Sequence, residues 1–300
     1  MSSELTRYEA VVIAPHYDDA VFSCGGLIAE SVKKGNVLVV NVFTNSEGGA
    51  MPCVVGDAER LAEEQAAGAS LGFETRSFGF QDAALRRTGS HSTARLFSPP
   101  TESDVDLIKT IAAAFENILS SVTAEKVFAP LGVGWHIDHV LCHLAIRMVK
   151  PAAPMLFYED APYCFLKRST AQRVAHVTSE NLSFAKLSWR DFGDTWGRVR
   201  RTALAQSVPV LTRPIAELVI AKFLHSLPAL QVGNAAELPL SEIKYDLSSH
   251  FDAKITACER YTSQVAEFFP NRSTMREFYL AHSRRVLPDV TYAERYWQTK

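Results

Sequence analysis

The stretch EAVVIAPHYDD, residues 9–19, decides how this chain folds. Its first part, Glu9–Ala14, is a β-branched apolar run that predicts a buried strand. A polar turn follows, and Ala20–Lys34 then predicts a helix. In a doubly wound parallel sheet, ligands bind at the carboxyl end of the first strand. The turn places three candidate functional side chains at such an end: His16, Asp18 and Asp19.

This turn does not have the composition of a dinucleotide site. A Rossmann cofactor site needs a glycine-rich turn, whereas Gly25 and Gly26 lie inside the predicted helix and G-x-G-x-x-G is absent. Two adjacent carboxylates can point in different directions, so one can bind a metal while the other accepts a proton. A purely structural interpretation also stands, because an aspartate just before Ala20 can cap the helix.

The remainder of the first 165 residues continues the alternation of strands and helices. Further strands are predicted at Val37–Phe43, Lys126–Pro130 and Met155–Tyr158, and further helices at Asp57–Leu71, Glu102–Ser121 and His139–Val149. This order predicts an α/β protein with a Rossmann-like, mostly parallel sheet and flanking helices. The polar segment Thr88–Thr101 predicts an exposed loop long enough to act as a lid or entrance.

Beyond residue 165, helical patterns dominate. They occupy 194–207, 214–226, 250–268 and 272–285, with weaker strand signals at Arg173–Val177 and Leu230–Val232. We therefore expect residues 1–165 to form an α/β core. Residues 166–300 are expected to form a mostly helical elaboration that packs on this core within the same structural domain.

The composition excludes several classes of function. The 300 residues are 47% hydrophobic and carry a formal net charge of -2, so no global field attracts nucleic acid or an anionic membrane. No apolar stretch reaches the roughly 20 residues of a membrane helix, and no signal-peptide pattern is visible. Five scattered cysteines without a Cys-x-x-Cys pair argue against a disulfide framework and a thiolate zinc site. We expect a cytoplasmic protein without nucleic-acid partners or a membrane span.

A second group of polar residues follows the strand predicted to end at Pro130. The segment GWHIDH, residues 134–139, holds His136, Asp138 and His139. Imidazoles clustered with a carboxylate are the usual zinc ligands. His143 lies one helical turn further on, and we interpret it as a partly buried helix residue rather than a ligand.

Together the two groups can form a catalytic metal site. Carboxyl ends of neighbouring parallel strands meet at one sheet edge, so we expect His16, Asp19 and His139 to bind a metal. Three protein ligands leave an open position for water, and Asp18 is placed to act as the general base. The spacing therefore predicts metal-assisted hydrolysis. Zn²⁺ is the default ion for these ligands, and Fe²⁺, Co²⁺ or Ni²⁺ also suit them.

The same residues resemble the PIG-L (LmbE-like) family of zinc-dependent N-acetylglucosaminyl deacetylases. The family patterns A-H-P-D-D and H-x-D-H are similar to HYDD at residues 16–19 and HIDH at residues 136–139. The likeness continues through TNSEGG (44–49), RLAEE (60–64) and FQDAALR (80–86), and it covers most of the chain.

The resemblance implies an LmbE-like fold and an enzyme that removes an acetyl group from a small N-acetylated amino-sugar conjugate. It implies that zinc is bound by His16, Asp19 and His139. It also implies that Asp18 is the general base that activates the attacking water.

Further roles rest on the same resemblance. His136, oriented by Asp138, would stabilise the oxyanion or protonate the departing amine. Three residues are implied to contact the substrate: Glu47, Asp82 and Arg86.

The chain departs from the family pattern at three positions near the site. Tyr17 and Ala20 stand where the family usually has proline and glutamate, and Gly134 stands where some members carry a tyrosine that helps to hold the oxyanion. None of these changes affects a proposed ligand or the base, so we expect the reaction type to be retained. Whether Trp135, another group or none takes the place of this tyrosine is left open.

Two other functions are compatible with the same residues. One is a zinc amidase of this fold that acts on a non-sugar amide, and the other is a catalytically silent carbohydrate-binding protein. A base beside an open metal position speaks against the silent protein. The aromatic pairs at 268–269, 278–279 and 296–297 are expected to pack the tail onto the core, and they also allow a homo-oligomer.

Overall fold

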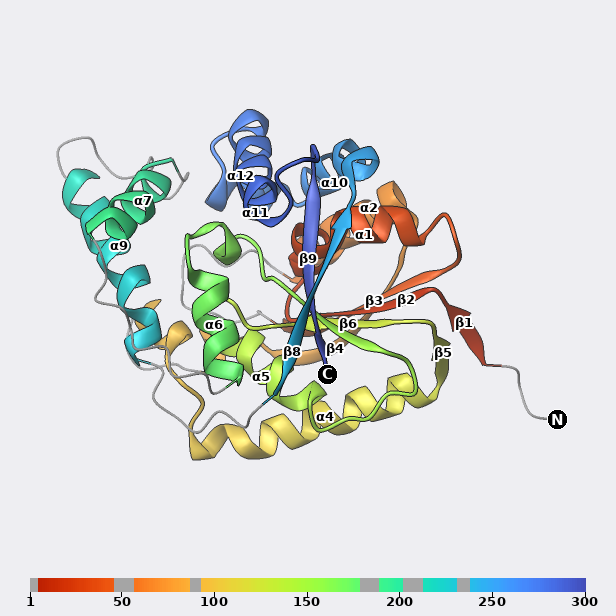
Figure 1. Cartoon of the computed structure of the whole chain (residues 1–300). Coiled ribbons are helices and arrows are strands. Elements are labelled where there is room, and N and C mark those ends of the chain that lie inside the picture. Colours follow the sequence, from red (N-terminus) through yellow and green to blue (C-terminus); the bar gives the residue numbers. More distant parts are fainter. Residues whose placement is uncertain (1–4, 46–56, 87–92, 179–188, 202–212, 231–237) are drawn as a thin grey trace.

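A computed structural model describes residues 5–45, 57–86, 93–178, 189–201, 213–230 and 238–300 of the chain. Its centre is a seven-stranded sheet with helices on both faces (Figure 1). The strands lie in the order β4–β3–β2–β6–β7–β9–β8. This is the predicted α/β class with a mostly parallel sheet, and the prediction is confirmed.

The parallel part of the sheet has five strands: β2 (Ala10–Ala14), β3 (Val37–Asn45), β4 (Glu74–Gln81), β6 (Val127–Pro130) and β7 (Met155–Tyr158). Two antiparallel strands extend it, since β9 (Ala293–Thr299) pairs with β7 and β8 (Leu240–Asp246) pairs with β9. A separate parallel pair is formed by β1 (Thr6–Tyr8) and β5 (Val122–Ala124). Every residue of β2 is buried, because helices cover both faces of the sheet.

The helices form two layers. One layer in Figure 1 contains α1 (Asp19–Ser31), α2 (Asp57–Leu71), α10 (Phe251–Cys258), α11 (Thr262–Phe268) and α12 (Arg272–Val286). The opposite layer contains α4 (Val105–Ser120) and α5 (Ile137–Ile146). After β7 come α6 (Ser169–Thr178), α7 (Trp189–Val199) and α9 (Arg213–Leu230). Short helical turns lie in the connections: α3 (Ala83–Arg86), η1 (Thr93–Phe97), η2 (Glu102–Asp104), η3 (Tyr163–Phe165) and η4 (Ser248–His250).

The direction of strand addition reverses beside β2. The chain proceeds from β2 to β3 and β4 on one side, and it later returns to β6 and β7 on the other side. Such a switch point opens a crevice at the carboxyl ends of the central strands. The polar turn after β2 and the loop after β6 both begin there.

The C-terminal part differs from its prediction in two ways. It is not only helical, because it supplies β8 and β9; their sequences mix charged and apolar residues and lack a continuous apolar run. The strand predicted at Arg173–Val177 is wrong, since these residues lie inside α6. Thr170, Arg173 and Val177 are buried at helical spacing, and this period outweighs the β-branched side chains.

Smaller differences concern boundaries. The edge strand β4 was not predicted, because its side chains are polar and mostly exposed or partly exposed. The helix expected over 250–268 is two helices, α10 and α11. Residues 202–207 of one expected helix, and 231–232 of the weak strand, lie outside the described residues.

The tail packs on the core as expected. Phe269, Phe278, Tyr279 and Tyr296 are all buried in the main hydrophobic cluster. Among the described helices, none is both long and apolar enough to cross a bilayer. Four cysteines are free and buried, and the fifth lies outside the described ranges: Cys24, Cys142, Cys164, Cys258 and Cys53.

Candidate metal centre

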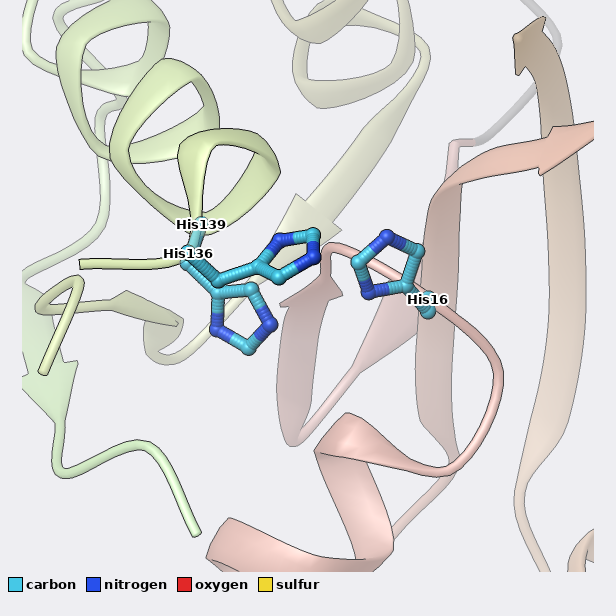
Figure 2. Close-up of side chains that lie close together, drawn as sticks. All are labelled: His16, His136 and His139. Carbon is cyan, nitrogen blue, oxygen red and sulfur yellow. The ribbon is translucent and has the colours of Figure 1, made fainter. Parts of the chain in front are cut away.

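The two predicted groups of polar residues meet at the switch point. The turn after β2 carries His16, and the start of α5 carries His136 and His139. Figure 2 shows the ring of His16 facing the two rings of the α5 end. One ring nitrogen of each histidine lies within 4.8 Å of the others, and all three side chains are buried. The fold therefore brings two distant segments together around one point.

Asp19 adds a carboxylate oxygen to this point. Its Oδ2 lies 3.2 Å from Nδ1 of His16 and 3.4 Å from Nε2 of His139. Two ligand atoms that are each 2.0–2.1 Å from a tetrahedral metal lie roughly 3.3–3.4 Å apart. Two imidazoles and a carboxylate at these separations suit a divalent metal. The donor set proposed from the sequence is thus assembled in one place.

Each of these two histidines also has a carboxylate behind it. Nε2 of His16 lies 3.0 Å from Oδ2 of Asp138, and Nδ1 of His139 lies 2.7 Å from Oδ1 of Asp160. Such carboxylates hold the far ring nitrogen in its protonated form and direct the lone pair of the near nitrogen toward a metal. Burial would lower the pKa of His16, but its bonds with Asp138 and Asp19 raise the pKa to about 10.

His136 has a different environment. Asp138 was expected to orient His136. In the structure Asp138 instead bonds His16, Arg86 and the backbone N–H of Ala83. Nδ1 of His136 is buried and has no hydrogen-bond partner within the described residues. Burial and the positive charge of His16 lower the pKa of His136 to about 3. A neutral imidazole with a free polar atom suits contact with a substrate better than metal ligation.

Asp18 occupies a strained position between the ligands and α1. Its φ is 91°, a value that non-glycine residues rarely adopt and that concentrates at functional sites. Its backbone N–H donates to the buried carboxylate of Glu64, which also accepts from Tyr261. Burial and the charge of Asp19 raise the pKa of Asp18 well above its usual value, and Arg60, 3.6 Å away, opposes this. A carboxylate with a raised pKa is suited to accept a proton near neutral pH.

The three predicted substrate contacts have separate outcomes. Asp82 lies at the edge of the site, with Oδ2 3.5 Å from Nε2 of His16. Arg86 pairs with Asp138 and lies over the ring of Phe43 at 4.6 Å. Both side chains are partly exposed and therefore close to solvent. Glu47 lies outside the described residues.

The loop between β6 and α5 has an unusual backbone. Gly132, Gly134 and Trp135 all have positive φ, at 83°, 88° and 66°. A Cβ at Gly134 would lie 2.1 Å from Cγ of Tyr163, so the ring of Tyr163 fills the space above this glycine. Arg173 of α6 supports the loop by donating to the carbonyl of Leu131 at 2.8 Å. This packing fixes the entry into α5 and hence the position of His136.

Part of the predicted entrance loop reaches the site. Residues 87–92 lie outside the described ranges, and 93–97 form η1. Phe97 contacts the ring of His136 edge-on, with centroids 5.7 Å apart, and the ring of Phe223 from α9 at 5.6 Å. Aromatic side chains from η1 and α9 therefore border the metal centre.

A second buried cluster also has residue types that bind metals. One donor atom from each of Glu159, Cys164 and His282 lies within 4.8 Å of the others. However, Arg295 pairs with Glu159, and Nδ1 of His282 lies 3.1 Å from a guanidinium nitrogen of Arg285. We call these three residues the tail cluster.

Sequence reasoning missed the role of Asp160. Its Oδ2 accepts from the backbone N–H groups of Gly132 and Val133 at 2.8 Å each, while Oδ1 contacts His139. The available signal was its position, since it follows β7 at the same sheet edge as the two predicted motifs. His143, interpreted as a helix residue, is fully buried, and its Nδ1 bonds the carbonyl of Pro130.

Comparison with known proteins identifies deacetylases as relatives. Residues 11–150 match the family described as PIG-L, GlcNAc-PI de-N-acetylase. The chain is 35% identical over 173 residues to 2'-N-acetylparomamine deacetylase of Streptomyces fradiae, covering 54% of this chain and 60% of that relative. It is 25% identical over 186 residues to 2'-N-acetylparomamine deacetylase of Niallia circulans, covering 50% and 66%. The matched regions thus span less than two thirds of these relatives.

Solved structures show the same fold over nearly the whole chain. A deacetylase–teicoplanin complex superposes with a TM-score of 0.66 at 19% identity, covering 98% of both chains. An A40926 pseudoaglycone deacetylase has a TM-score of 0.63 at 20% identity, again covering 98% of both chains. A zinc-inhibited form of teicoplanin deacetylase has a TM-score of 0.65 at 20% identity and covers 97% of both. Residues 11–150 are therefore a PIG-L family domain within an LmbE-like fold, as the sequence analysis expected.

Proposed function

From this PIG-L domain we propose that the chain is a metal-dependent N-deacetylase that removes an acetyl group from an N-acetylated amino-sugar conjugate. The observation that carries the proposal is the convergence of His16, Asp19 and His139, with Asp138 and Asp160 behind the two histidines. Relatives that act on 2'-N-acetylparomamine support the substrate class.

We propose Zn²⁺ as the ion, held by His16, Asp19 and His139. The donor set is that of catalytic zinc sites, which use three protein ligands from histidine and carboxylate. When bound, the cation supplies Lewis acidity toward the amide carbonyl and increases the acidity of water. Fe²⁺, Co²⁺ and Ni²⁺ suit the same ligands.

The protein's own residues perform the proton transfers. Asp18 accepts a proton from the attacking water at a carboxylate oxygen, and its raised pKa brings this step closer to neutral pH. The same proton then passes to the amine nitrogen as the C–N bond breaks. His136 is neutral and keeps one ring N–H, which donates a hydrogen bond to the carbonyl oxygen as negative charge develops there. Asp138 and Asp160 keep the ligand rings in the orientation that this chemistry needs.

The partly exposed residues at the rim suit substrate binding. We propose that Asp82 and Arg86 contact the sugar, together with Glu47. Phe97 of η1, which contacts His136 and is backed by Phe223 of α9, would limit the shape of the conjugate. The four buried free cysteines among the described residues fit a reducing compartment, and we propose the cytoplasm.

Release of primary amine tests the proposal. Protein treated with a chelator and then reloaded with Zn²⁺ is incubated with 2'-N-acetylparomamine and with N-acetylglucosamine. We expect amine release that depends on the metal, and none from a matched Asp18→Asn variant that still binds Zn²⁺. No release from either compound by fully loaded protein would contradict an amino-sugar deacetylase.

A further inference from the structure

Tyr163 is held at the metal centre by its ring. It begins η3, the first helical turn after β7, and a Cβ at Gly134 would lie 2.1 Å from its Cγ. The same ring contacts His139 edge-on, with centroids 5.7 Å apart and an interplanar angle of 87°. It also contacts Phe97 at 6.1 Å. Three neighbours from three segments therefore fix the direction in which the phenol points.

The hydroxyl of Tyr163 differs from those of the buried tyrosines around it. Within the described part of the chain it makes no hydrogen bond. Tyr163 is partly buried, whereas the hydroxyl of a fully buried tyrosine normally has a partner. Four core tyrosines follow this rule by donating to Ile13, Phe22, Glu64 or Glu294: Tyr158, Tyr279, Tyr261 and Tyr296.

The surroundings of this hydroxyl are those of the reacting groups. Burial raises the pKa of the Tyr163 phenol, and so do the charges of Asp19, Asp18, Asp160 and Asp82. These carboxylates form or support the metal centre, the base and the rim. With a pKa well above its usual value near 10, the phenol is protonated at neutral pH and can donate a hydrogen bond. The one polar atom of Tyr163 is thus an unused donor beside the site of chemistry.

We propose that Tyr163 is a further catalytic residue whose hydroxyl donates a hydrogen bond to the acetyl oxygen of the substrate. This inference rests on the proposed deacetylase function. The acetyl oxygen gains negative charge when water adds to the carbonyl carbon, so a fixed donor stabilises the transition state more than the bound substrate. No bond to Tyr163 forms or breaks, and its proton stays on the phenol. Tyr163 thereby fills, from η3, the space that Gly134 leaves in the loop before His136.

The alternative is that Tyr163 only packs the loop. The Tyr163→Phe variant separates the two roles, because it keeps the ring over Gly134, Phe97 and His139 and removes only the hydroxyl. Tyr17→Phe is the matched control. Tyr17 lies between two site residues, but its hydroxyl is engaged by Oγ of Ser77 at 2.8 Å.

The first measurement is kcat and KM with 2'-N-acetylparomamine and Zn²⁺-loaded protein. For Tyr163→Phe we expect kcat to fall about 10²-fold, the loss typical of one oxyanion donor. KM should change less than about threefold, because loss of a contact made equally in the bound substrate and the transition state would raise KM instead of lowering kcat. Zn²⁺ affinity and Tm should match the wild type, because a structural effect would alter them. Tyr17→Phe should keep kcat within about threefold. A Tyr163→Phe variant as active as the wild type would overturn the proposal.

The second measurement asks whether the hydroxyl contacts the acetyl oxygen itself. The same proteins are tested with the N-thioacetyl analogue, in which a sulfur that accepts hydrogen bonds weakly replaces this oxygen. The loss caused by Tyr163→Phe should shrink to a few-fold, since the partner of the hydroxyl is already absent. An equal loss with both compounds would place the hydroxyl elsewhere and overturn the proposal. Absence of amine release by the wild type would instead contradict the deacetylase function on which this role depends.

Discussion

Among the residues that the structure describes, two regions contain histidine and carboxylate within metal-binding distance, yet their chemistry differs. His16, Asp19 and His139 form the motif cluster at the switch point, and Glu159 and His282 belong to the tail cluster beyond β7. A search by residue type and distance alone finds both regions. The difference lies in what balances the charge of each carboxylate.

In the tail cluster, arginines already supply the positive charge. Arg295 pairs with Glu159, and Arg285 can only donate to Nδ1 of His282. Nε2 of His282 must then carry the proton, and it lies 2.9 Å from Oε2 of Glu159. Neither ring nitrogen has a lone pair free for a metal. Burial, despite the nearby Glu159, keeps the pKa of His282 low.

The motif cluster differs both in the charges around its carboxylate, Asp19, and in the direction of its histidine lone pairs. Within the described residues, no lysine or arginine pairs with Asp19. The outer nitrogens of His16 and His139 are bonded to Asp138 and Asp160, so their inner nitrogens are directed toward Asp19. A metal site therefore needs more than suitable residue types. Its carboxylate must not be paired with lysine or arginine, and its histidines must direct a lone pair toward the metal position.

The largest effects are expected when one histidine in each cluster is replaced by alanine. His139→Ala should lose its metal and its turnover, since it removes a ligand. His282→Ala should retain one metal per chain and lose only about 1–3 kcal/mol of stability, because the buried Glu159 carboxylate loses a polar neighbour. Metal analysis after dialysis gives the first result, and urea unfolding gives the second. Full metal occupancy in His139→Ala would move the third ligand elsewhere, with His143 as the first candidate.

A smaller effect is expected from replacing the general base Asp18, which lies beside the motif cluster and is not a ligand. Asp18→Asn should reduce kcat by about 10²–10⁴-fold, the usual contribution of a general base. Its metal content should remain that of the wild type. Measuring zinc and kcat on the same preparation checks both statements. Loss of zinc from this variant would show that Asp18 is a ligand.

A comparison of adjacent residues tests the carboxylates behind the histidines. Asp160→Asn should weaken Zn²⁺ binding by about 10–100-fold, as is typical when the partner of a ligand histidine is changed. Glu159→Gln, one position earlier, should leave Zn²⁺ affinity unaltered because it belongs to the tail cluster. Competition with a chromogenic chelator measures both. Equal weakening in the two variants would indicate a general loss of structure rather than a specific role.

The smallest expected effect is on the pH dependence of stability. Burial would raise the pKa of Glu159, but His282 and Arg295 outweigh it and lower the pKa. The stability that Glu159 contributes is therefore complete above about pH 4.5 and is lost as pH falls through its folded-state pKa. Glu159→Gln should flatten the decline of unfolding free energy between about pH 5 and 3, measured by urea denaturation.

A surface ion pair provides the control for this experiment. Glu277 pairs with Arg201, and both side chains are about half exposed. Such pairs contribute little to stability, so Glu277→Gln should reproduce the wild-type pH dependence. If Glu159→Gln also reproduces the wild-type pH dependence, Glu159 does not stabilise the protein through its ion pairs in the tail cluster.

The sequence was sufficient for four parallel strands of the sheet, β2, β3, β6 and β7, and for the first group of side chains. Long apolar runs such as Val37–Phe43 identify buried parallel strands, and polar residues at their ends then share one edge. The edge strands β4 and β8, and β9 beside β8, escaped prediction because strands that mix polar and apolar residues carry a weaker pattern. Arg173–Val177 was misassigned because β-branched residues within a helix imitate a strand.

Within the site, the sequence predicted which residues lie together better than it predicted which of them bond to one another. Asp138 was expected beside His136, its close neighbour in sequence, yet the start of α5 directs it to His16. Side-chain direction in the first turn of a helix depends on the loop before it, which here has three residues with positive φ. Asp160 and Tyr163 come from a later segment, and only the folded sheet brings them to the site.

X-ray absorption at the zinc edge tests the central claim most directly, because it reports both the number and the type of ligand atoms. Protein reloaded with one equivalent of Zn²⁺ should show only nitrogen and oxygen neighbours at about 2.0–2.2 Å, as the motif cluster requires. Chemical analysis of the same sample should find one ion per chain. A zinc–sulfur distance near 2.3 Å would show a thiolate ligand, which the motif cluster does not contain, and would contradict the account.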